Sequence, residues 1–494
     1  MKIPERGMNP ENVMAEVERR RHADLDWRSG RTFGFVYDAG REAEALAKRA
    51  YVAYLSENAL DPTSFPSLLR FENEIVSMAR EHLGGDEEVV GNFTSGGTES
   101  ILLAVKTARD LYRATRPEIR QPEMVLPVTA HAAFHKAAEY FDVKAVPVPV
   151  GEDFRADVAA MREAVGPNTI LLVGSAPSYA HGVIDPIVDI GALALEHGLL
   201  FHVDACVGGF MLPYFRRLGE PVPDFDFRVP GVTSMSMDLH KYGFAPKGAS
   251  IVLQKDRGQR KHQIFACSSW PGYSVVNATV QSSKTGGPLA AAWAVLHFFG
   301  DEGYLELART LRDTTKRIAE GIDAMEGLYV LGRPEMCMLA MASDTVDVFH
   351  VVDEMQIRGW YVQAQLGFDG SPPNFHLSVG PTNAPHVEAL LSDLAASVEA
   401  AKAFGPSEVA QMVKSTFAAM SPTDISPEVF TSMLSMAGVE GTDLPERRAD
   451  INSVLDALPR PVCDRLLVEF VNELFTESAL PKEGQPKEGQ PKEG

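Results

Sequence analysis

The chain has 494 residues, 45% of them hydrophobic, which is ordinary for a globular protein of two or three domains. Its formal net charge of −21 argues against nonspecific binding to nucleic acid or to an anionic membrane, because those partners attract clustered lysine and arginine. The 4 cysteines lie far apart and form no CxxC pair, so we predict free thiols in a reducing compartment and no metal site.

The N-terminal segment, residues 1–83, is charged from its second residue and contains no apolar stretch that would serve as a secretory signal. The longest nearly unbroken apolar run of the chain, Leu289 to Phe299, has 11 residues, and it already contains His297. A helix that crosses a bilayer needs about 20 such residues. We therefore expect a cytoplasmic protein without a transmembrane segment.

Residues 84–300 alternate short β-branched runs with amphipathic patterns; the runs are MVLPV, VKAVPVPV, TILLVG, LLFHV, VTSMSM and ASIVLQ. This alternation predicts a large α/β domain with a mostly parallel central sheet sandwiched by helices. In TESILLAVKTARDLYRA, apolar residues at helical spacing place the start of a helix close to Thr98. The turn Ser95-Gly96-Gly97-Thr98 therefore abuts a helix N-terminus.

Three further segments follow the large domain. Residues 301–404 combine long helical patterns with short strand-like runs, which predicts a smaller α+β domain. Residues 405–478 are predicted as a helical extension, with Val468, Val471 and Leu474 on one face of its last helix, where they would form a structural cap or an oligomer contact. Residues 479–494 repeat proline, glycine and charged residues without any apolar one, so we expect disorder and no chemistry there.

Two polar residues follow strand-like runs of the large domain. Asp204 ends the apolar run of LLFHVDACVGGF, at the sheet edge where α/β domains bind ligands, and Lys241 follows the run of VTSMSMDLHKYGFAPKGAS. The alternatives are a helix cap for the aspartate and a solvated loop charge for the lysine. The separation of 241 − 204 = 37 residues leaves room for a helix and a returning strand, which would bring both to one edge.

The glycine-rich turn and one histidine complete the pattern. The glycines let backbone N–H groups approach an anion, the hydroxyls of Ser95 and Thr98 donate, and the helix dipole favours a phosphate. His131 follows another strand and would lie over a flat ring; a buried histidine with satisfied hydrogen bonds is the alternative. A lysine, a carboxylate, a phosphate cradle and a flat group are what pyridoxal 5′-phosphate requires, so we predict that cofactor.

Several motifs resemble those of the pyridoxal-phosphate-dependent decarboxylase-like family of fold type I, and within it the sphingosine-1-phosphate lyase branch: TSGGTES, HAAFHKAA, APSYAHGVIDPI, HVDACVGGF and DLHKYGFAPKGAS. The resemblance extends from about residue 30 to residue 404, and the tail beyond has no matching counterpart. It implies that Lys241 holds the cofactor covalently, that Asp204 pairs with the pyridine nitrogen and that His131 stacks on the ring.

The same resemblance implies which residues bind the cofactor phosphate. His240 and the turn from Ser95 to Thr98 would bind it from one subunit, and the segment Ser283-Lys284-Thr285-Gly286-Gly287 would join them from a neighbouring subunit. A homodimer with shared active sites follows from that arrangement. Where the family has SRPGG, this chain has a lysine in place of the fork-shaped arginine donor.

Within the lyase branch, Tyr37 and Lys247 resemble the tyrosine and the lysine of the pocket for the substrate phosphate, and Tyr179 resembles another pocket tyrosine. Two departures concern the substrate. Asp61 in NALDP replaces a histidine, which would oppose a phosphorylated substrate unless the carboxylate merely caps its own turn. Val275 replaces an active-site tyrosine.

The function predicted from these residues is a retro-aldol cleavage of a β-hydroxy amine, phosphorylated or not, into an aldehyde and an amine. Lys241 is the expected proton donor, while Tyr179 and His131 are candidates for handling the hydroxyl proton. An amino-acid decarboxylase on the same scaffold is the main alternative. A cofactor-binding protein that has lost turnover and acts as an interaction module is a third.

Overall fold

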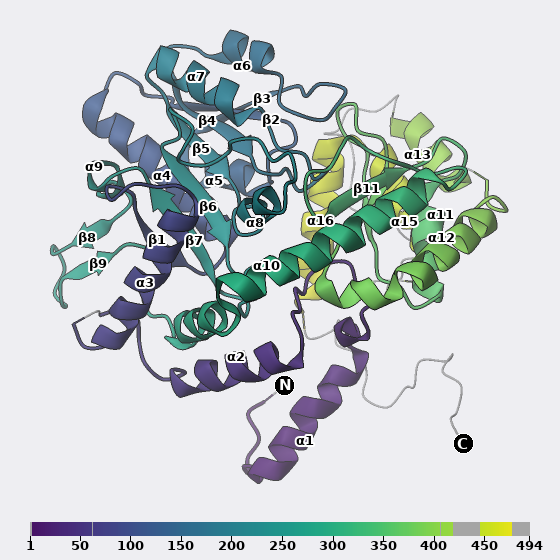
Figure 1. Ribbon diagram of the computed structural model, residues 1–494, viewed down its shortest axis with the longest axis horizontal. Coiled ribbons are helices and arrows are strands. Elements are labelled where there is room, and N and C mark those ends of the chain that lie inside the picture. The colour runs from purple at the N-terminus through teal and green to yellow at the C-terminus, as the bar shows by residue number, and fades with distance from the viewer. Residues whose placement is uncertain (1, 62, 406, 418–444, 477–494) are drawn as a thin grey trace. The chain divides into compact units, whose positions relative to one another are not determined.

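The computed structural model describes residues 2–61, 63–405, 407–417 and 445–476 (Figure 1). The predicted disordered repeat and part of the predicted helical extension lie outside these ranges. The chain divides into two compact units. The large unit comprises Trp27–Asp344 and Gly359–Ala395, and the terminal unit comprises Met1–Asp26, Thr345–Arg358 and Ala396–Gly494.

The large unit is built on a seven-stranded sheet with the strand order β1-β7-β6-β5-β4-β2-β3. Within it β7 runs antiparallel to both of its neighbours, and the other pairs are parallel. The prediction of a mostly parallel central sheet is confirmed. The strands are β1 (Val90–Thr94), β2 (Glu123–Pro127), β3 (Lys144–Val148), β4 (Thr169–Ser175), β5 (Leu200–Asp204), β6 (Ser234–Asp238) and β7 (Ser250–Gln254).

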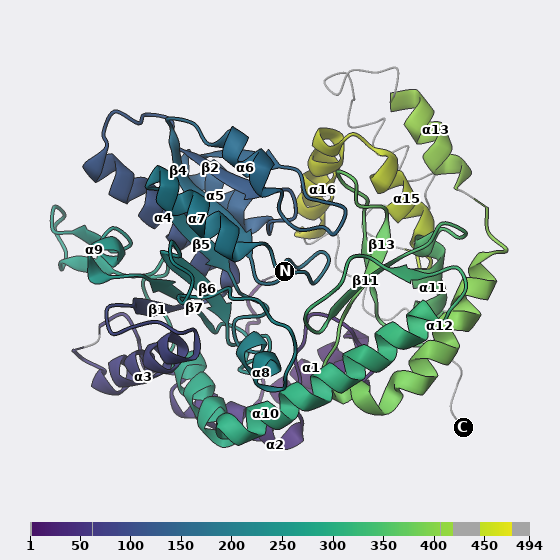
Figure 2. The same cartoon turned by 45° about the horizontal axis from the view of Figure 1, so that its top comes forward.

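Helices cover both faces of this sheet (Figures 1 and 2). On β4, Val173 belongs to the apolar cluster formed with α4 (Gly97–Thr115) and α5 (Ala133–Phe141). The next residue, Gly174, faces α7 (Ile187–His197), and a Cβ there would lie 2.8 Å from Ile187 Cδ1. Because side chains alternate along a strand, the two helix layers lie on opposite faces. Each large side chain buried between the layers contributes about 1.5–3 kcal/mol.

Other helices of the large unit surround this core: η2 (Trp27–Ser29), α2 (Arg41–Ala53), α3 (Pro66–His82), α6 (Val158–Ala164), α8 (Leu212–Arg217), α9 (Arg257–Arg260), α10 (Gly287–Asp323) and η3 (Pro381–His386). The expected domain boundary near residue 300 falls inside α10. Gly300 leaves the helical conformation there, with φ 56° and ψ −175°, and kinks the helix. A positive φ of this kind favours glycine, which has no Cβ.

A second, four-stranded antiparallel sheet also belongs to the large unit, in the order β10-β11-β13-β12. Its strands are β10 (Tyr329–Val330), β11 (Met338–Ala342), β12 (Gln363–Gln365) and β13 (Asn374–Ser378). Gln363 of β12 is directly opposite His376 of β13, so both side chains point to the same face. A separate hairpin pairs β8 (Phe265–Cys267) with β9 (Val275–Asn277).

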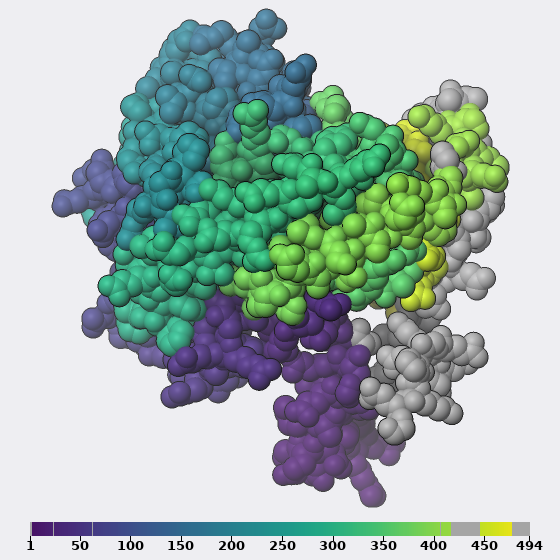
Figure 3. Space-filling view, turned by 45° about the vertical axis from the view of Figure 1, so that its right-hand side comes forward, coloured from purple at the N-terminus to yellow at the C-terminus, as the bar shows by residue number. Residues whose placement is uncertain are grey.

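The terminal unit consists of helices: α1 (Pro10–Arg20), η1 (Arg21–Ala23), α11 (Val348–Ile357), α13 (Glu408–Phe417), α15 (Ala449–Ala457) and α16 (Arg460–Leu474). The helix α12 (Val387–Ala401) spans the boundary between the units. The Asp353 carboxylate accepts hydrogen bonds from the amides of Arg448 and Ala449, both at 2.9 Å, and so ties α11 to the start of α15. Figure 3 shows α1, in purple, at the surface, and α1 has no buried residue.

The expected apolar face of α16 is present and exposed. The side chains of Val468, Val471 and Leu474 are exposed, as is that of Leu467 beside them. In the described ranges, no helix is both long enough and apolar enough to cross a membrane.

Candidate active site

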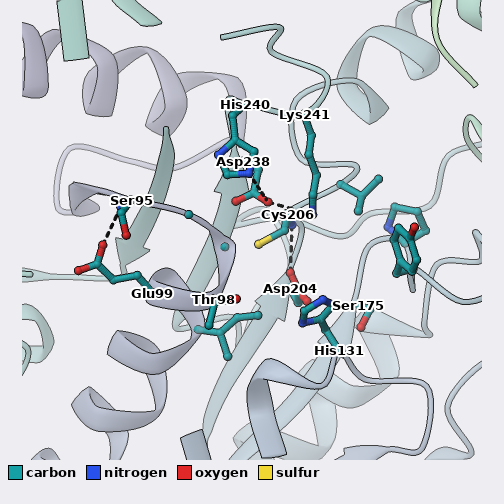
Figure 4. Close-up of a pocket in the computed structure, with 16 residues that line it drawn as sticks. Ser95, Thr98, Glu99, His131, Ser175, Asp204, Cys206, Asp238, His240 and Lys241 are labelled. Atoms are coloured by element: carbon teal, nitrogen blue, oxygen red, sulfur yellow. Dashed lines mark hydrogen bonds and ion pairs between the residues drawn. The ribbon is translucent and has the colours of Figure 1, made fainter. Parts of the chain in front are cut away.

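A cavity of about 390 Å³ lies where β4, β5 and β6 end and α4 begins (Figure 4). It gathers the lysine, the aspartate, the histidines, the pocket tyrosine and the glycine-rich turn that the sequence predicts to act together. The predicted residues that line it are Ser95, Gly96, Gly97, Thr98, His131, Tyr179, Asp204, His240 and Lys241. Residues 143 positions or more apart in the chain, such as Thr98 and Lys241 (241 − 98 = 143), therefore share one wall.

The glycine-rich turn is tied in place by Glu99, which sequence reasoning missed. One of its carboxylate oxygens accepts the Ser95 amide at 2.6 Å and the other accepts the Val280 amide at 2.7 Å. The helix α4 begins at Gly97, so its first amides have no partner within the helix. These amides and the helix dipole form an anion site that faces the cavity.

Gly97 has no room for a side chain. A Cβ there would lie 2.8 Å from Cys206 Sγ and 2.9 Å from both Asp238 oxygens. We expect Gly97→Ala to raise the Kd for pyridoxal phosphate about tenfold or more, because such overlap strains a packed site by about 1–3 kcal/mol. The Kd is measured by absorbance titration of the apoprotein.

Gly96→Ala provides the matched control for that prediction. A Cβ at Gly96 would find its nearest neighbour, His240 Cε1, at 3.5 Å, which is ordinary contact. Its effect on the Kd is therefore expected to be the smaller one. Unchanged cofactor affinity in Gly97→Ala would contradict the proposed cradle.

Lys241 is paired with Asp238, the second residue that sequence reasoning missed. Lys241 Nζ lies 2.9 Å from Asp238 Oδ2, and Asp238 is 2% exposed. Burial alone would lower the pKa of Lys241, but the Asp238 carboxylate outweighs it and raises that pKa above its ordinary value. Burial likewise acts to raise the pKa of Asp238, and the Lys241 charge brings the net shift below the ordinary value. The signal in the sequence was the spacing i, i+3 in DLHK.

Asp204 is held by a buried polar network on β5 and β6. Its Oδ1 accepts the Cys206 amide at 3.0 Å and the Ser236 hydroxyl at 3.1 Å. Ser236 Oγ also lies 3.2 Å from Nε2 of His202, whose pKa burial lowers to about 4. The network therefore fixes one carboxylate oxygen with neutral partners. It fits a carboxylate held ready for a cationic ring nitrogen.

The two predicted histidines differ in environment. The His131 side chain is exposed toward the cavity, and its Nδ1 accepts the Ala133 amide at 3.1 Å, so it is not the buried, satisfied histidine of the alternative interpretation. The His240 Nε2 lies 3.6 Å from Asp238 Oδ2. Burial lowers the pKa of His240.

Cys206 also lines the cavity, and burial raises the pKa of its thiol well above the ordinary value, so the thiol stays neutral.

Tyr37 and Lys247, which are expected to bind the substrate phosphate, lie together next to Tyr242 and do not line the 390 Å³ cavity. Lys247 Nζ lies 5.0 Å from the centre of the Tyr37 ring, and that ring packs edge-on against Tyr242. Burial raises the pKa of Tyr37 to about 12, so it remains a neutral phenol. Tyr179 lines the cavity, and burial raises its pKa as well.

The segment from Ser283 to Gly287 does not line this cavity. Ser283, Lys284 and Thr285 line an adjacent cavity of about 330 Å³, which shares Ser95 with the first and also includes Lys247.

Gly286 and Gly287 pack against α2 and α3. A Cβ at Gly286 would lie 2.6 Å from Leu68, and a Cβ at Gly287 would lie 2.8 Å from Tyr51. Within one chain the segment from Ser283 to Gly287 therefore packs next to the cofactor cavity without lining it.

Asp61 is exposed and lies outside both cavities. Its Oδ1 accepts the Thr63 amide at 2.8 Å and the Thr63 hydroxyl at 2.6 Å, while Oδ2 accepts the Ser64 hydroxyl at 3.0 Å. The hydrogen bonds to Thr63, first of all, lower the pKa of Asp61. This geometry matches the turn-capping alternative. Val275 lies in the exposed hairpin and does not line either cavity.

The residues of the cavity fit pyridoxal phosphate. Asp238 Oδ1 and Ser175 Oγ are buried at its wall without a hydrogen-bond partner in the described part of the chain, as expected where a polar ligand completes the site. The lysine, the free side of the Asp204 carboxylate and the open amides at α4 match the aldehyde, the ring nitrogen and the phosphate. The donor set therefore suits each polar part of the cofactor.

Two family models match the chain. The pyridoxal-dependent decarboxylase conserved domain matches residues 2–341. The C-terminal putative HTH domain of pyridoxal-dependent enzymes matches residues 406–473. The second match corrects the expectation that the tail has no counterpart.

The proteins similar to this chain include sphingosine-1-phosphate lyases and amino-acid decarboxylases. The sphingosine-1-phosphate lyase of Arabidopsis thaliana is 42% identical over 81% of this chain and 74% of its own length, and that of Oryza sativa subsp. japonica is 44% identical over 79% and 73%. The solved sphingosine-1-phosphate lyase of Burkholderia pseudomallei has a TM-score of 0.78 at 36% identity, covering 85% of this chain and 95% of that one. A glutamate decarboxylase of Lactobacillus brevis, with a TM-score of 0.72 at 20% identity, shares the fold.

The cofactor site and these matches agree. The predicted lysine, aspartate and glycine-rich turn lie together inside the matched domain. The chain belongs to the pyridoxal-dependent decarboxylase family, in which it groups with the sphingosine-1-phosphate lyases, and it is a pyridoxal-phosphate-dependent lyase.

Proposed function

We propose that the protein cleaves a phosphorylated β-hydroxy amine of the sphingosine 1-phosphate type into an aldehyde and a phosphorylated amine. The observation that carries the proposal is the pairing of Lys247 with Tyr37 beside the cofactor lysine, in a chain whose relatives are lyases for that substrate. The capping role of Asp61 supports it too, because the carboxylate then does not oppose the substrate phosphate within this chain.

Each residue of the site has a separate role in the proposed reaction. When bound, the cofactor accepts the electron pair of the bond that breaks, and Asp204 stabilises the positive ring nitrogen that makes this possible. Lys247 and Tyr37 hold the phosphate as a cation and a neutral donor. Tyr179 orients the hydroxyl of the carbon that becomes the aldehyde, and Lys241, freed as an amine when the substrate amine takes its place, would accept the proton that this hydroxyl loses.

Lys241 supplies the proton that the product carbon requires. The Asp238 carboxylate at 2.9 Å stabilises the ammonium form and so keeps a proton on Nζ once the lysine is free. The same ion pair fixes the position of Nζ at the end of β6. Proton donation by a positioned group typically contributes about 10²–10⁴-fold to the rate.

A product assay tests the proposal. The holoenzyme is incubated with sphingosine 1-phosphate and, separately, with a panel of amino acids, and aldehyde and carbon dioxide are both quantified. Aldehyde from the phosphorylated substrate is the expected result. Carbon dioxide from an amino acid would favour a decarboxylase, and neither product would favour a cofactor-binding protein without turnover.

The pH dependence of binding tests the role of Lys247. Part of this side chain is exposed, yet loss of hydration in the site, followed by the nearby Lys241 charge, lowers the pKa of Lys247 to about 8. The cation is therefore present below pH 8 and lost as the pH rises through it. In the holoenzyme Lys241 is part of the covalent link and no longer a free ammonium, so the pKa of Lys247 lies at or above that value there. We expect kcat/KM for a phosphorylated substrate to fall about tenfold per pH unit above the pKa of Lys247.

Lys247→Arg should move this fall to higher pH, because guanidinium keeps its charge. Lys247→Met should lower kcat/KM at pH 7 and remove the fall. The profile is measured with sphingosine 1-phosphate between pH 6 and 10. A fall that persists unchanged in Lys247→Met would assign it to another group.

We also propose a homodimer. Val13, Met14 and Val17 form an apolar face on α1, each 43–55% exposed, so the described part of the chain leaves this face uncovered. A second copy that covers this face would account for it. Sedimentation velocity should give the mass of a dimer for the wild type and of a monomer for the double variant Val13→Asp/Val17→Asp, with Glu11→Ala as a surface control. A monomeric wild type would refute the proposal.

A further inference from the structure

The Tyr179 side chain packs against two residues of the four-stranded sheet. Its hydroxyl donates a hydrogen bond of 2.7 Å to Gln363 Oε1 on β12. Its ring stacks on the imidazole of His376 on β13, with ring centroids 4.6 Å apart and an angle of 27° between the planes. Gln363 and His376 are opposite each other in the β12–β13 register. One face of the small sheet therefore holds both the hydroxyl and the ring of this cavity residue.

His376 is a neutral support. It is 0% exposed, and burial lowers its pKa to about 4, so it carries no charge at neutral pH. A neutral flat ring at stacking distance restricts the rotation of Tyr179 without attracting the substrate phosphate. The orientation of the phenol is thus set by two residues that themselves lie outside the cavity lining.

The direction of the hydrogen bond matters for the chemistry. A phenol has a single proton, and donating it to Gln363 leaves only lone pairs of the oxygen for other partners. Those lone pairs can accept a hydrogen bond from a substrate hydroxyl. A phenol that instead donated its proton into the cavity would compete for the lone pairs of that hydroxyl and hold it in the opposite sense.

We propose that Gln363 and His376 are positioning residues that turn Tyr179 into a hydrogen-bond acceptor for the substrate hydroxyl next to the bond that breaks. The inference rests on the proposed function, because it assigns that hydroxyl to Tyr179. It names specificity determinants on the small sheet for amines that carry a β-hydroxyl.

The test compares two ligands that differ in one hydroxyl: a short-chain 2-amino-3-hydroxyalkyl phosphate and its 3-deoxy counterpart. Their Kd values are measured from the amplitude of the holoenzyme absorbance change on rapid mixing, before the hydroxylated ligand is cleaved. Gln363→Leu removes the acceptor, and it should raise the Kd of the hydroxylated ligand about tenfold while changing that of the 3-deoxy ligand less than about twofold. Gln363→Glu, which can only accept, should restore most of the difference.

His376 is tested with a pair of variants. His376→Phe keeps a flat neutral ring and should retain the preference for the hydroxylated ligand. His376→Ala removes the stacking partner and should reduce that preference. If His376→Phe loses the preference as fully as His376→Ala does, stacking is not the role of this residue and the inference fails for it.

Gln365→Leu is the matched control on the same strand face. The Gln365 amide binds the Ala180 carbonyl at 3.2 Å and Asn374 Oδ1 at 2.7 Å, so this variant disturbs the same loop without touching the phenol. It should affect both ligands equally. Equal weakening of both ligands by Gln363→Leu, or no rescue by Gln363→Glu, would overturn the inference.

The two hypotheses fail in distinguishable ways. A wild type that prefers the hydroxylated ligand but releases no aldehyde from it would refute the proposed function and leave the positioning role standing. A wild type that releases aldehyde while Gln363→Leu retains the full preference would refute the positioning role alone. Melting temperature and cofactor absorbance of each variant are recorded. We expect unchanged cofactor absorbance throughout and a lower melting temperature for His376→Ala, which leaves a cavity at a buried site, so the ratio of the two Kd values and not either Kd alone is compared between variants.

Discussion

Lys241→Ala is expected to abolish the visible absorbance band of the lysine-bound cofactor and to lower kcat by about a thousandfold or more. Only an amine at this position can form the covalent link, and the same group supplies the product proton, which alone is typically worth about 10²–10⁴-fold. The measurement combines absorbance spectra, borohydride reduction followed by mass analysis, and turnover. Retention of a reducible link to the cofactor in Lys241→Ala would show that another lysine holds it.

Lys241→Arg is the matched control for this variant. It keeps a cation that Asp238 can bind, so the charge balance of the buried pair survives. It cannot form the link, and it should therefore be as inactive as Lys241→Ala while folding more like the wild type. A difference in stability between the two variants would measure the cost of leaving Asp238 unpaired.

Asp204→Ala should still bind pyridoxal phosphate through the turn at α4 but lose turnover by about three orders of magnitude. A carboxylate about 4 Å from a protonated ring nitrogen is worth roughly 4 kcal/mol at an effective dielectric of 20, before desolvation is subtracted. That energy corresponds to about three decades in rate if it is lost from the transition state. Cofactor Kd and kcat are measured separately on the same variant.

Two further variants separate charge from packing at this position. Asp204→Asn keeps the shape and the bonds to Cys206 and Ser236 but loses the charge, so it should be nearly as slow as Asp204→Ala. Ser236→Ala keeps the charge and removes one hydrogen bond, and its loss should be about tenfold at most. Near-normal turnover of Asp204→Asn would remove the carboxylate charge from the mechanism.

Local chemistry in the sequence was enough to predict the cofactor site and most of the fold. Strands β2 to β5 and β7 contain β-branched or apolar runs, and β6 alternates serine with methionine. The alternation of these strands with helices predicts a mostly parallel sheet whose strand ends collect the ligands. Lys241, Asp204 and the turn at α4 each follow a recognisable element. These residues line one cavity because the carboxyl ends of parallel strands lie at the same edge of the sheet, and the sequence pattern already predicts that sheet.

Elements of weak local propensity were decided by tertiary pairing. β1 contains Gly91 and Asn92, and β12 reads Gln-Ala-Gln, so neither resembles a strand in isolation. β1 forms because it completes the ladder with β7, and β12 because it completes the ladder with β13. The β1–β7 ladder joins segments far apart in the sequence, such as Val90 and Gln254, which no local pattern reports. The β12–β13 ladder joins nearby segments, and there the polar residues of β12 give no strand signal of their own.

The sequence by itself determined the cofactor, the chemical class of the site and the main sheet, because these depend on residue types next to short, regular elements. Only the tertiary structure decided which polar groups pair within the site. The Lys241–Asp238 ion pair and the bond from Tyr179 to Gln363, which is 184 residues away, depend on side-chain direction and distance after folding. The same holds for Asp61, whose charge opposes a phosphate only if its carboxylate faces the cavity, and the turn around Thr63 directs it elsewhere.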